Sequence, residues 1–159
     1  MFLYPFKSAY TYDRCTRIRH PRKYEDVFEL LTGENGVFAS KAQVLLFAAA
    51  IGFNEGKRTP FADKDSFEPI RMATFENLGK NFRTVLDTLA VAETKDTKIL
   101  SPDKFDDRIL IFEEYACGGL EVLKIRLEAQ NSPLDVVIKL LAEQQRQDEA
   151  ENDVFSYLQ

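Results

Sequence analysis

The stretch from residue 40 to residue 54 constrains the fold more than any other part of the chain. Ser40 is of a residue type that caps helix N-termini, because its hydroxyl can accept a hydrogen bond from a backbone N–H of the first turn. Every residue from Val44 to Ile51 is apolar. A helix of this composition is apolar on nearly every face, and such a helix is buried. The sequence therefore predicts a domain built around a central helix over residues 40–54.

Apolar residues at helical spacing predict further helices before and after this central one. Ser101-Pro102-Asp103 and Asn131-Ser132-Pro133 are start signals, because proline is tolerated in the first turn of a helix. Gly118-Gly119 interrupts a continuous pattern, and each glycine costs up to about 1 kcal/mol relative to alanine inside a helix. Either the helix breaks there or a neighbouring backbone packs closely against it, and we expect a break or a kink. The expected helices cover residues 21–32, 76–95, 101–118, 120–130 and 134–147.

Residues 70–75 alternate weakly between apolar and polar side chains and could be extended. One such run cannot form a stable sheet by itself. The predicted fold class is therefore mainly α: a compact, single-domain bundle of about five to six helices with at most a small β element near residues 70–75. A length of 159 residues suits one domain. We divide the chain into a basic, tyrosine-rich arm (1–20), a helical domain (21–147) and an acidic C-terminal tail (148–159). We expect the acidic stretch from Asp148 to Asp153 to be frayed or disordered.

The formal net charge of −5 is the sum of two opposed regions. The first 23 residues hold six bases and one acid, a net charge of +5, with three tyrosines interleaved among them. From Glu93 to the end, fifteen acids outnumber eight bases and leave a net charge of −7. The total therefore excludes only a uniformly basic protein. A basic arm with tyrosines can neutralise phosphates and stack on bases, or it can dock on an acidic partner or on the chain's own acidic half.

Two sets of residues are candidates for binding. The basic arm and the loop after the central helix supply possible DNA contacts, which Arg71 could extend. The apolar residues after the acidic stretch could dock back on the domain or bind a partner protein. The candidate DNA-binding residues are Arg14, Arg17, Arg19, Arg22, Lys23, Lys57 and Arg58, and the candidate partner-binding residues are Phe155, Tyr157 and Leu158.

The sequence carries no recognisable catalytic, metal or cofactor motif. Its single histidine, His20, lies five residues from Cys15 in the arm, without the fixed frame that a nucleophile and its base require. A zinc site needs three or four ligands, and the chain has only His20, Cys15 and the distant Cys117. The acidic residues from 103 to 114 are interpreted as a hydrated helix face, with a carboxylate metal site as the alternative. No phosphate-binding glycine loop is present. We expect no enzyme activity, no metal and no cofactor.

The expected location is the cytoplasm. Pro5 and Lys7 interrupt the apolar start of the chain, so it does not have the pattern of a signal peptide. The apolar run from Val44 to Ile51 is far shorter than the roughly 20 residues that span a bilayer. Two cysteines in different contexts are typical of a reducing compartment, with Cys117 in the core. We expect no membrane partner.

Three segments together resemble a known family. They are Ile18-Arg19-His20-Pro21-Arg22-Lys23-Tyr24-Glu25, Lys41 to Phe53 with Gly56-Lys57-Arg58, and Glu68-Pro69-Ile70-Arg71. In order and type they are similar to the small bacterial DNA phosphorothioation-associated protein 4 over roughly residues 17–145. These proteins accompany the Dnd systems, which replace a non-bridging phosphate oxygen of DNA with sulfur and defend against phage. The resemblance implies an accessory role in a defence gene cluster and carries no catalytic residues with it.

Three hypotheses follow. The first is a non-enzymatic adaptor of a DNA-modification-based phage-defence system that contacts DNA through its basic arm. The alternative is a protein-interaction or structural subunit of a larger defence complex without direct DNA binding. The third is an enzyme that uses the acidic helix. The expected partners are other proteins of the gene cluster and, under the first hypothesis, DNA; a homo-oligomer is open, since no heptad pattern specifies one.

Overall fold

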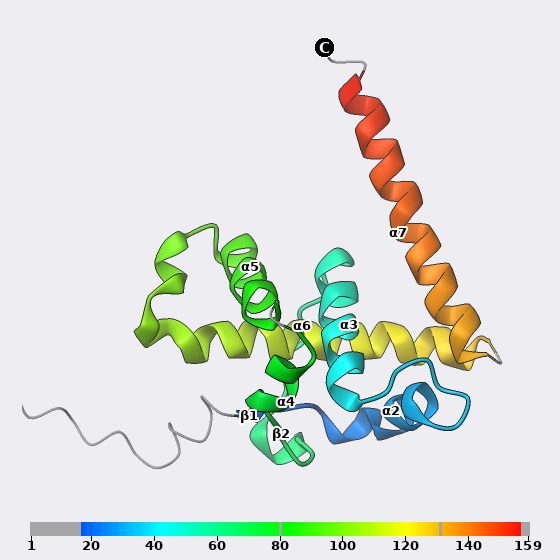
Figure 1. Cartoon of the computed structure of the whole chain (residues 1–159), viewed down its shortest axis with the longest axis horizontal. Coiled ribbons are helices and arrows are strands. Elements are labelled where there is room, and N and C mark those ends of the chain that lie inside the picture. The colour runs from blue at the N-terminus through cyan, green and yellow to red at the C-terminus, as the bar shows by residue number, and fades with distance from the viewer. Residues whose placement is uncertain (1–16, 80, 131, 157–159) are drawn as a thin grey trace, which may run out of the picture.

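The computed structural model describes residues 17–79, 81–130 and 132–156, with the side chains of residues 154 and 155 excepted. These residues form one mainly helical domain with a two-stranded antiparallel ladder (Figure 1). The predicted fold class is therefore confirmed. The helices are α2 (Glu25–Thr32), α3 (Lys41–Asn54), α4 (Met72–Asn77), α5 (Phe82–Thr94), α6 (Phe105–Glu128) and α7 (Pro133–Ser156). The strands are β1 (Arg17–Ile18) and β2 (Ile70–Arg71), and the 3-10 turns are η1 (Arg22–Tyr24), η2 (Asp63–Asp65), η3 (Thr97–Leu100) and η4 (Pro102–Lys104).

Helix α3 lies in the core, where the sequence placed the central helix. Its N-cap is Ser40, whose hydroxyl accepts a hydrogen bond from the backbone N–H of Gln43 at 3.3 Å. Val44, Leu45 and Ala48 have no exposed surface. The helix crosses the long helix α6 and packs closely against it (Figure 1). The prediction of a buried helix over residues 40–54 is confirmed, and α6 is its main partner.

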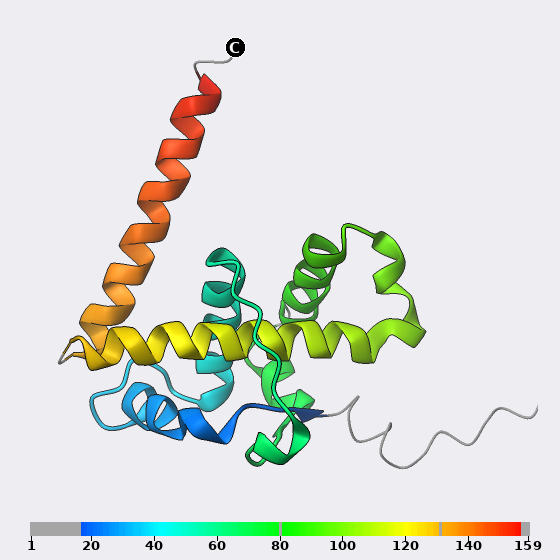
Figure 2. The same ribbon diagram turned by 180° about the vertical axis from the view of Figure 1, so that it is seen from behind.

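Gly118 and Gly119 lie inside the unbroken helix α6, so the predicted break there is wrong. A Cβ on Gly119 would lie 1.7 Å from the carbonyl oxygen of Ala48 in α3. A Cβ on Gly118 would lie 1.9 Å from the carbonyl oxygen of Lys57, in the segment that leaves α3 and crosses α6 (Figure 2). The two glycines therefore admit two different backbone segments at van der Waals distance. Close packing of a neighbouring backbone, the alternative weighed above, is what the structure shows.

The predicted helix over residues 76–95 is divided into α4 and α5 around Gly79, and only Ile70–Arg71 of the weakly alternating stretch is extended. The division lets two phenylalanines from different helices meet a third on α6. The ring centroids of Phe75 and Phe82 are 4.8 Å apart, and those of Phe82 and Phe112 are 5.5 Å apart. Phe75 and Phe112 are fully buried, so this aromatic cluster anchors α4 and α5 to the core.

Helix α7 begins at Pro133, one residue before the predicted start, and it continues to Ser156 instead of ending near residue 147. The acidic stretch from Asp148 to Asp153 is helical, so its prediction as frayed or disordered is wrong. Side-chain amides stabilise this part, because Gln144 donates a hydrogen bond to Asp148, four residues along the helix, at 2.8 Å. The outer half of α7 projects beyond the rest of the domain in both views (Figures 1 and 2).

Candidate functional site

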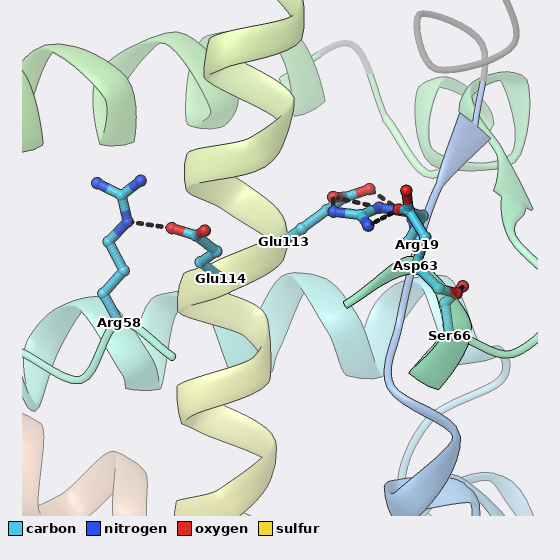
Figure 3. A network of polar contacts seen from close by, with 6 residues as sticks. All are labelled: Arg19, Arg58, Asp63, Ser66, Glu113 and Glu114. Carbon is cyan, nitrogen blue, oxygen red and sulfur yellow. Dashed lines mark hydrogen bonds and ion pairs between the residues drawn. The ribbon is translucent and has the colours of Figure 1, made fainter. Parts of the chain in front are cut away.

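Two adjacent carboxylates lie buried in the middle of α6. Glu113 is 3% exposed and Glu114 is 9% exposed. A buried carboxylate is strongly unfavourable unless it is paired with a cation and hydrogen-bonded. Each of the two is met by an arginine, and the two arginines approach α6 from opposite sides (Figure 3).

Arg19, which directly follows β1, binds Glu113. Its backbone N–H donates to Oε1 at 2.7 Å, and its Nε and Nη2 donate to Oε2 at 2.9 and 2.6 Å. Its Nη1 also donates to Asp63 of η2. Burial disfavours the charged guanidinium, but the hydrogen bonds and charge of Glu113 and Asp63 outweigh this effect and raise the pKa of Arg19. The cluster therefore fastens the start of the described chain and η2 to the centre of α6.

Arg58 makes the corresponding contacts on the other side of α6. Its Nε donates to Glu114 at 2.5 Å, and its Nη1 donates to Glu93 near the end of α5 at 2.8 Å. Tyr115 donates its hydroxyl hydrogen to the second oxygen of Glu93. The hydrogen bonds from Tyr115 and Arg58 hold the pKa of Glu93 below its usual range. Burial and the hydrogen bond to Glu93 raise the pKa of Tyr115 to about 12, so this hydroxyl stays protonated at neutral pH.

These two clusters tie segments together and have the chemistry of structural ion pairs. Arginine holds a carboxylate through several fixed donors, which positions both groups. The acidic run weighed above as a metal site thus contributes two of its glutamates to arginine pairs. Within the described ranges, no group of three or more His, Cys, Asp or Glu side chains is placed to hold a metal ion.

His20 and Cys117 are both buried. His20 is 1% exposed and packs edge-on against Phe28, with ring centroids 4.8 Å apart. Burial lowers the pKa of its imidazole. The charge of Glu25 raises this pKa, and the charge of Lys41 lowers it. Cys117 lies in the core as predicted, and burial raises the pKa of its thiol to about 11. Both groups are therefore uncharged packing residues at neutral pH.

The described part of the arm continues into an exposed basic strip along β1, β2 and η1. Arg17 and Arg71 are direct partners in the antiparallel ladder, and both are exposed. Arg22 and Lys23 follow in η1 and are also exposed; the guanidinium of Arg22 lies 5.1 Å from the ring centroid of Phe67. We call Arg17, Arg22, Lys23 and Arg71 the basic edge. It lies on the side of α6 opposite α5 and α7 (Figure 1).

Lys57 and Arg58, two of the other candidate DNA-binding residues, do not converge on this edge. Lys57 pairs with Glu121 of α6 at 3.1 Å, and Arg58 lies across α6 from Arg19 (Figure 3). Arg14, Tyr157 and Leu158 lie outside the described residues, and Phe155 belongs to α7 but its side chain is not described. Sequence reasoning treated Arg19 and Arg58 as phosphate contacts and missed their carboxylate partners. The sequence signal that could have revealed these pairs was Glu113-Glu114, two adjacent acids amid the apolar residues of α6.

The chain was compared with known proteins at three levels. A family model described as DNA sulphur modification system-associated protein 4 matches residues 17–158. The searches of curated proteins and of solved structures gave no match. Along the described residues, no helix combines the length and the apolar content needed to cross a membrane.

Proposed function

The chain belongs to the family of DNA sulphur modification system-associated protein 4, and from this premise we propose that it is a non-enzymatic adaptor of such a system. In this role it contacts DNA through the basic edge and joins it to other proteins of the same defence gene cluster. The proposal places it in the cytoplasm, where that DNA is. The resemblance noted from the sequence and the family match both point to a DNA sulphur modification system.

The observation that carries the DNA contact is the pair Arg17 and Arg71. The ladder holds these two exposed arginines directly opposite each other, so both side chains start from the same face of the ladder. A phosphate that approaches this face would meet both positive charges. Arg22 and Lys23 add two charges next to them, and Lys7 and Arg14 add two more in the preceding sequence. Several closely spaced cations are what a DNA backbone requires.

The absence of enzyme activity is supported by how the polar core is used. Glu113 and Glu114 are the most buried carboxylates in the described chain, and arginines bind both. A general base would need an oxygen that faces the substrate, and a metal ligand would need one that faces the ion. Since Arg19 and Arg58 are engaged in these pairs, the proposed phosphate contacts fall on the basic edge and Arg14.

A binding assay tests the DNA contact. Fluorescence anisotropy with a labelled duplex of about 20 base pairs is measured over a range of salt concentrations. Arg17→Ala with Arg71→Ala should weaken binding and reduce the salt slope by about 2, because each phosphate contact contributes roughly 0.9. The matched control is Lys139→Ala with Arg146→Ala, two exposed bases on α7 that should leave both values unchanged. Parallel titration of a duplex with phosphorothioate linkages tests a preference for sulfur.

The alternative is a protein-interaction subunit without DNA contact. The observation that favours it is the projecting, acidic outer half of α7, which repels phosphate and presents a long surface to a protein. Absence of duplex binding at low salt would refute the DNA contact and leave this alternative. Equal effects of the edge variants and the α7 control variants would do the same, since they would indicate unspecific attraction.

A further inference from the structure

An open groove lies between α3, α5 and α7. Its volume is about 470 Å³. Residues of the second half of α3, of α5 and of α7 line it. These parts of the three helices lie on the side of α6 opposite the basic edge (Figures 1 and 2). Most of its surface is apolar, and the principal apolar side chains are Phe47, Ile51, Phe53, Val85, Leu89 and Leu140.

Both charged side chains that line the groove are acidic. They are Glu55 and Glu143, and no lysine or arginine is among the described residues that line it. Arg126 of α6 donates two hydrogen bonds to Glu143, at 3.0 and 2.9 Å, so the negative charge of the rim rests on Glu55 and on the acidic residues farther along α7. Beyond the groove, helical spacing continues the same face of α7 from Gln144 and Gln147 to Asp148 and Glu151. The rim is therefore acidic next to an apolar lining.

The groove also leaves large apolar side chains exposed. Leu141 on its α7 wall is 56% exposed, and Phe53 at the end of α3 is 39% exposed. The outer half of α7 projects past the body of the domain, although helices are stabilised in water mainly by packing of an apolar face. Contiguous apolar surface with a polar rim marks an interaction site. The groove and the projecting half of α7 thus form one continuous surface that suits an elongated partner.

We propose that this groove binds an amphipathic helix of a partner protein, with apolar anchors on one face and lysine or arginine beside them. The proposal deepens the adaptor role above and rests on it. Helices dock in this way by laying apolar residues at i, i+3 or i+4 and i+7 into a hydrophobic groove. The acidic rim selects a basic helix, because complementary charge gives specificity and like charge excludes wrong partners.

The same charge argument disfavours two other occupants. DNA phosphates would face Glu55 and the acidic outer half of α7. A second copy of this chain has a net charge of −5, and its own projecting helix is acidic. Because the groove and the basic edge lie on opposite sides of α6, a helix and a DNA duplex could be held at once, as an adaptor requires.

Peptide binding tests the proposal. The probe is a fluorescein-labelled 14-residue peptide of leucine and lysine, with leucines at helical spacing. One comparison peptide has the same composition in an order without an apolar helix face, and the other replaces each lysine by glutamate. We expect the first peptide to bind at least 10-fold more tightly than either comparison peptide.

Two matched substitutions locate the binding site. Ala50→Arg places a large cation in the groove, at an exposed position of α3, and should weaken binding at least 10-fold. Ala142→Arg makes the same change at an exposed position of α7 that does not line the groove, and should leave binding unchanged. Glu55→Lys tests the rim without filling the groove and should weaken the leucine–lysine peptide several-fold. Circular dichroism melts show that each variant is folded.

Equal affinity for the peptide without an apolar face, or equal weakening by Ala50→Arg and Ala142→Arg, would overturn the proposal. Sedimentation that shows a wild-type dimer, with Ala50→Arg monomeric, would assign the groove to a second copy instead and would also overturn it. The DNA assay above uses other residues, so failure of the DNA contact and failure of the groove are separately visible.

Discussion

Replacing Gly119 by alanine gives the sharpest test of how this domain is held together. Inside a helix, alanine is favoured over glycine by about 1 kcal/mol, so local propensity alone predicts a more stable protein. The tertiary structure predicts the opposite sign. The new Cβ would lie 1.7 Å from the carbonyl oxygen of Ala48, half the 3.4 Å at which ordinary contact begins.

The size of the effect follows from what must move. The obstructing atom belongs to the backbone of α3, so no side-chain rotation relieves the overlap and the two central helices must separate. Overpacking typically costs about 1–3 kcal/mol, and a backbone contact belongs at the upper end of that range. After the gain in helix propensity, the variant should be about 2 kcal/mol less stable. For a chain of this length, the melting temperature should fall by about 4–8 °C.

Urea unfolding followed by circular dichroism measures the change in free energy. Ala50→Gly, at an exposed position of α3, is the control for propensity and should lose about 1 kcal/mol. Gly52→Ala tests the same crossing from the other helix, since its Cβ would lie 2.0 Å from the carbonyl oxygen of Tyr115, and it should also destabilise. A Gly119→Ala variant as stable as the wild type, with an unchanged urea dependence, would refute the reasoning.

Two further predictions concern the buried polar groups. Arg19→Met removes the guanidinium donors of the buried Glu113 and leaves only the backbone N–H from that position, so the free energy of unfolding in urea should fall by about 3–5 kcal/mol. Adding Glu113→Gln should recover part of this loss. A loss below 1 kcal/mol for the single variant would contradict the role of the pair. Cys117, with its pKa raised to about 11, should resist iodoacetamide at pH 8 in a Cys15→Ser background and react once urea unfolds the chain; fast labelling of the folded protein would show that the thiol is accessible.

Much of the fold was predictable because it depends on interactions between residues close in sequence. Ser40 caps α3 through a bond that spans three residues, and the apolar run after it specifies a buried helix wherever the chain folds. Pro133 likewise acts locally at the start of α7, whereas the division between α4 and α5 around Gly79 was not predicted. The basic character of the first segment is also a property of the sequence, and so was the resemblance to the family that matches.

The candidate site was predicted less well, because its geometry joins residues far apart in the chain. Arg19 and Glu113 are separated by 94 positions, and Arg58 and Glu114 by 56. A charge on an isolated segment looks the same whether it will face solvent or a buried carboxylate. Only the crossing of the chain over α6 decides which bases pair internally and which remain on the surface.

Gly118 and Gly119 show which features the sequence determines and which depend on tertiary structure. The sequence by itself determined that the long helical pattern carries a local weakness there and that either a break or a close neighbour must explain it. The tertiary structure decided between the two, because the contacts of α3 and the following segment with α6 outweigh the propensity lost at two residues. The same packing pairs Arg19 and Arg58 with carboxylates, aligns Arg17 with Arg71, and leaves the groove open beside α7.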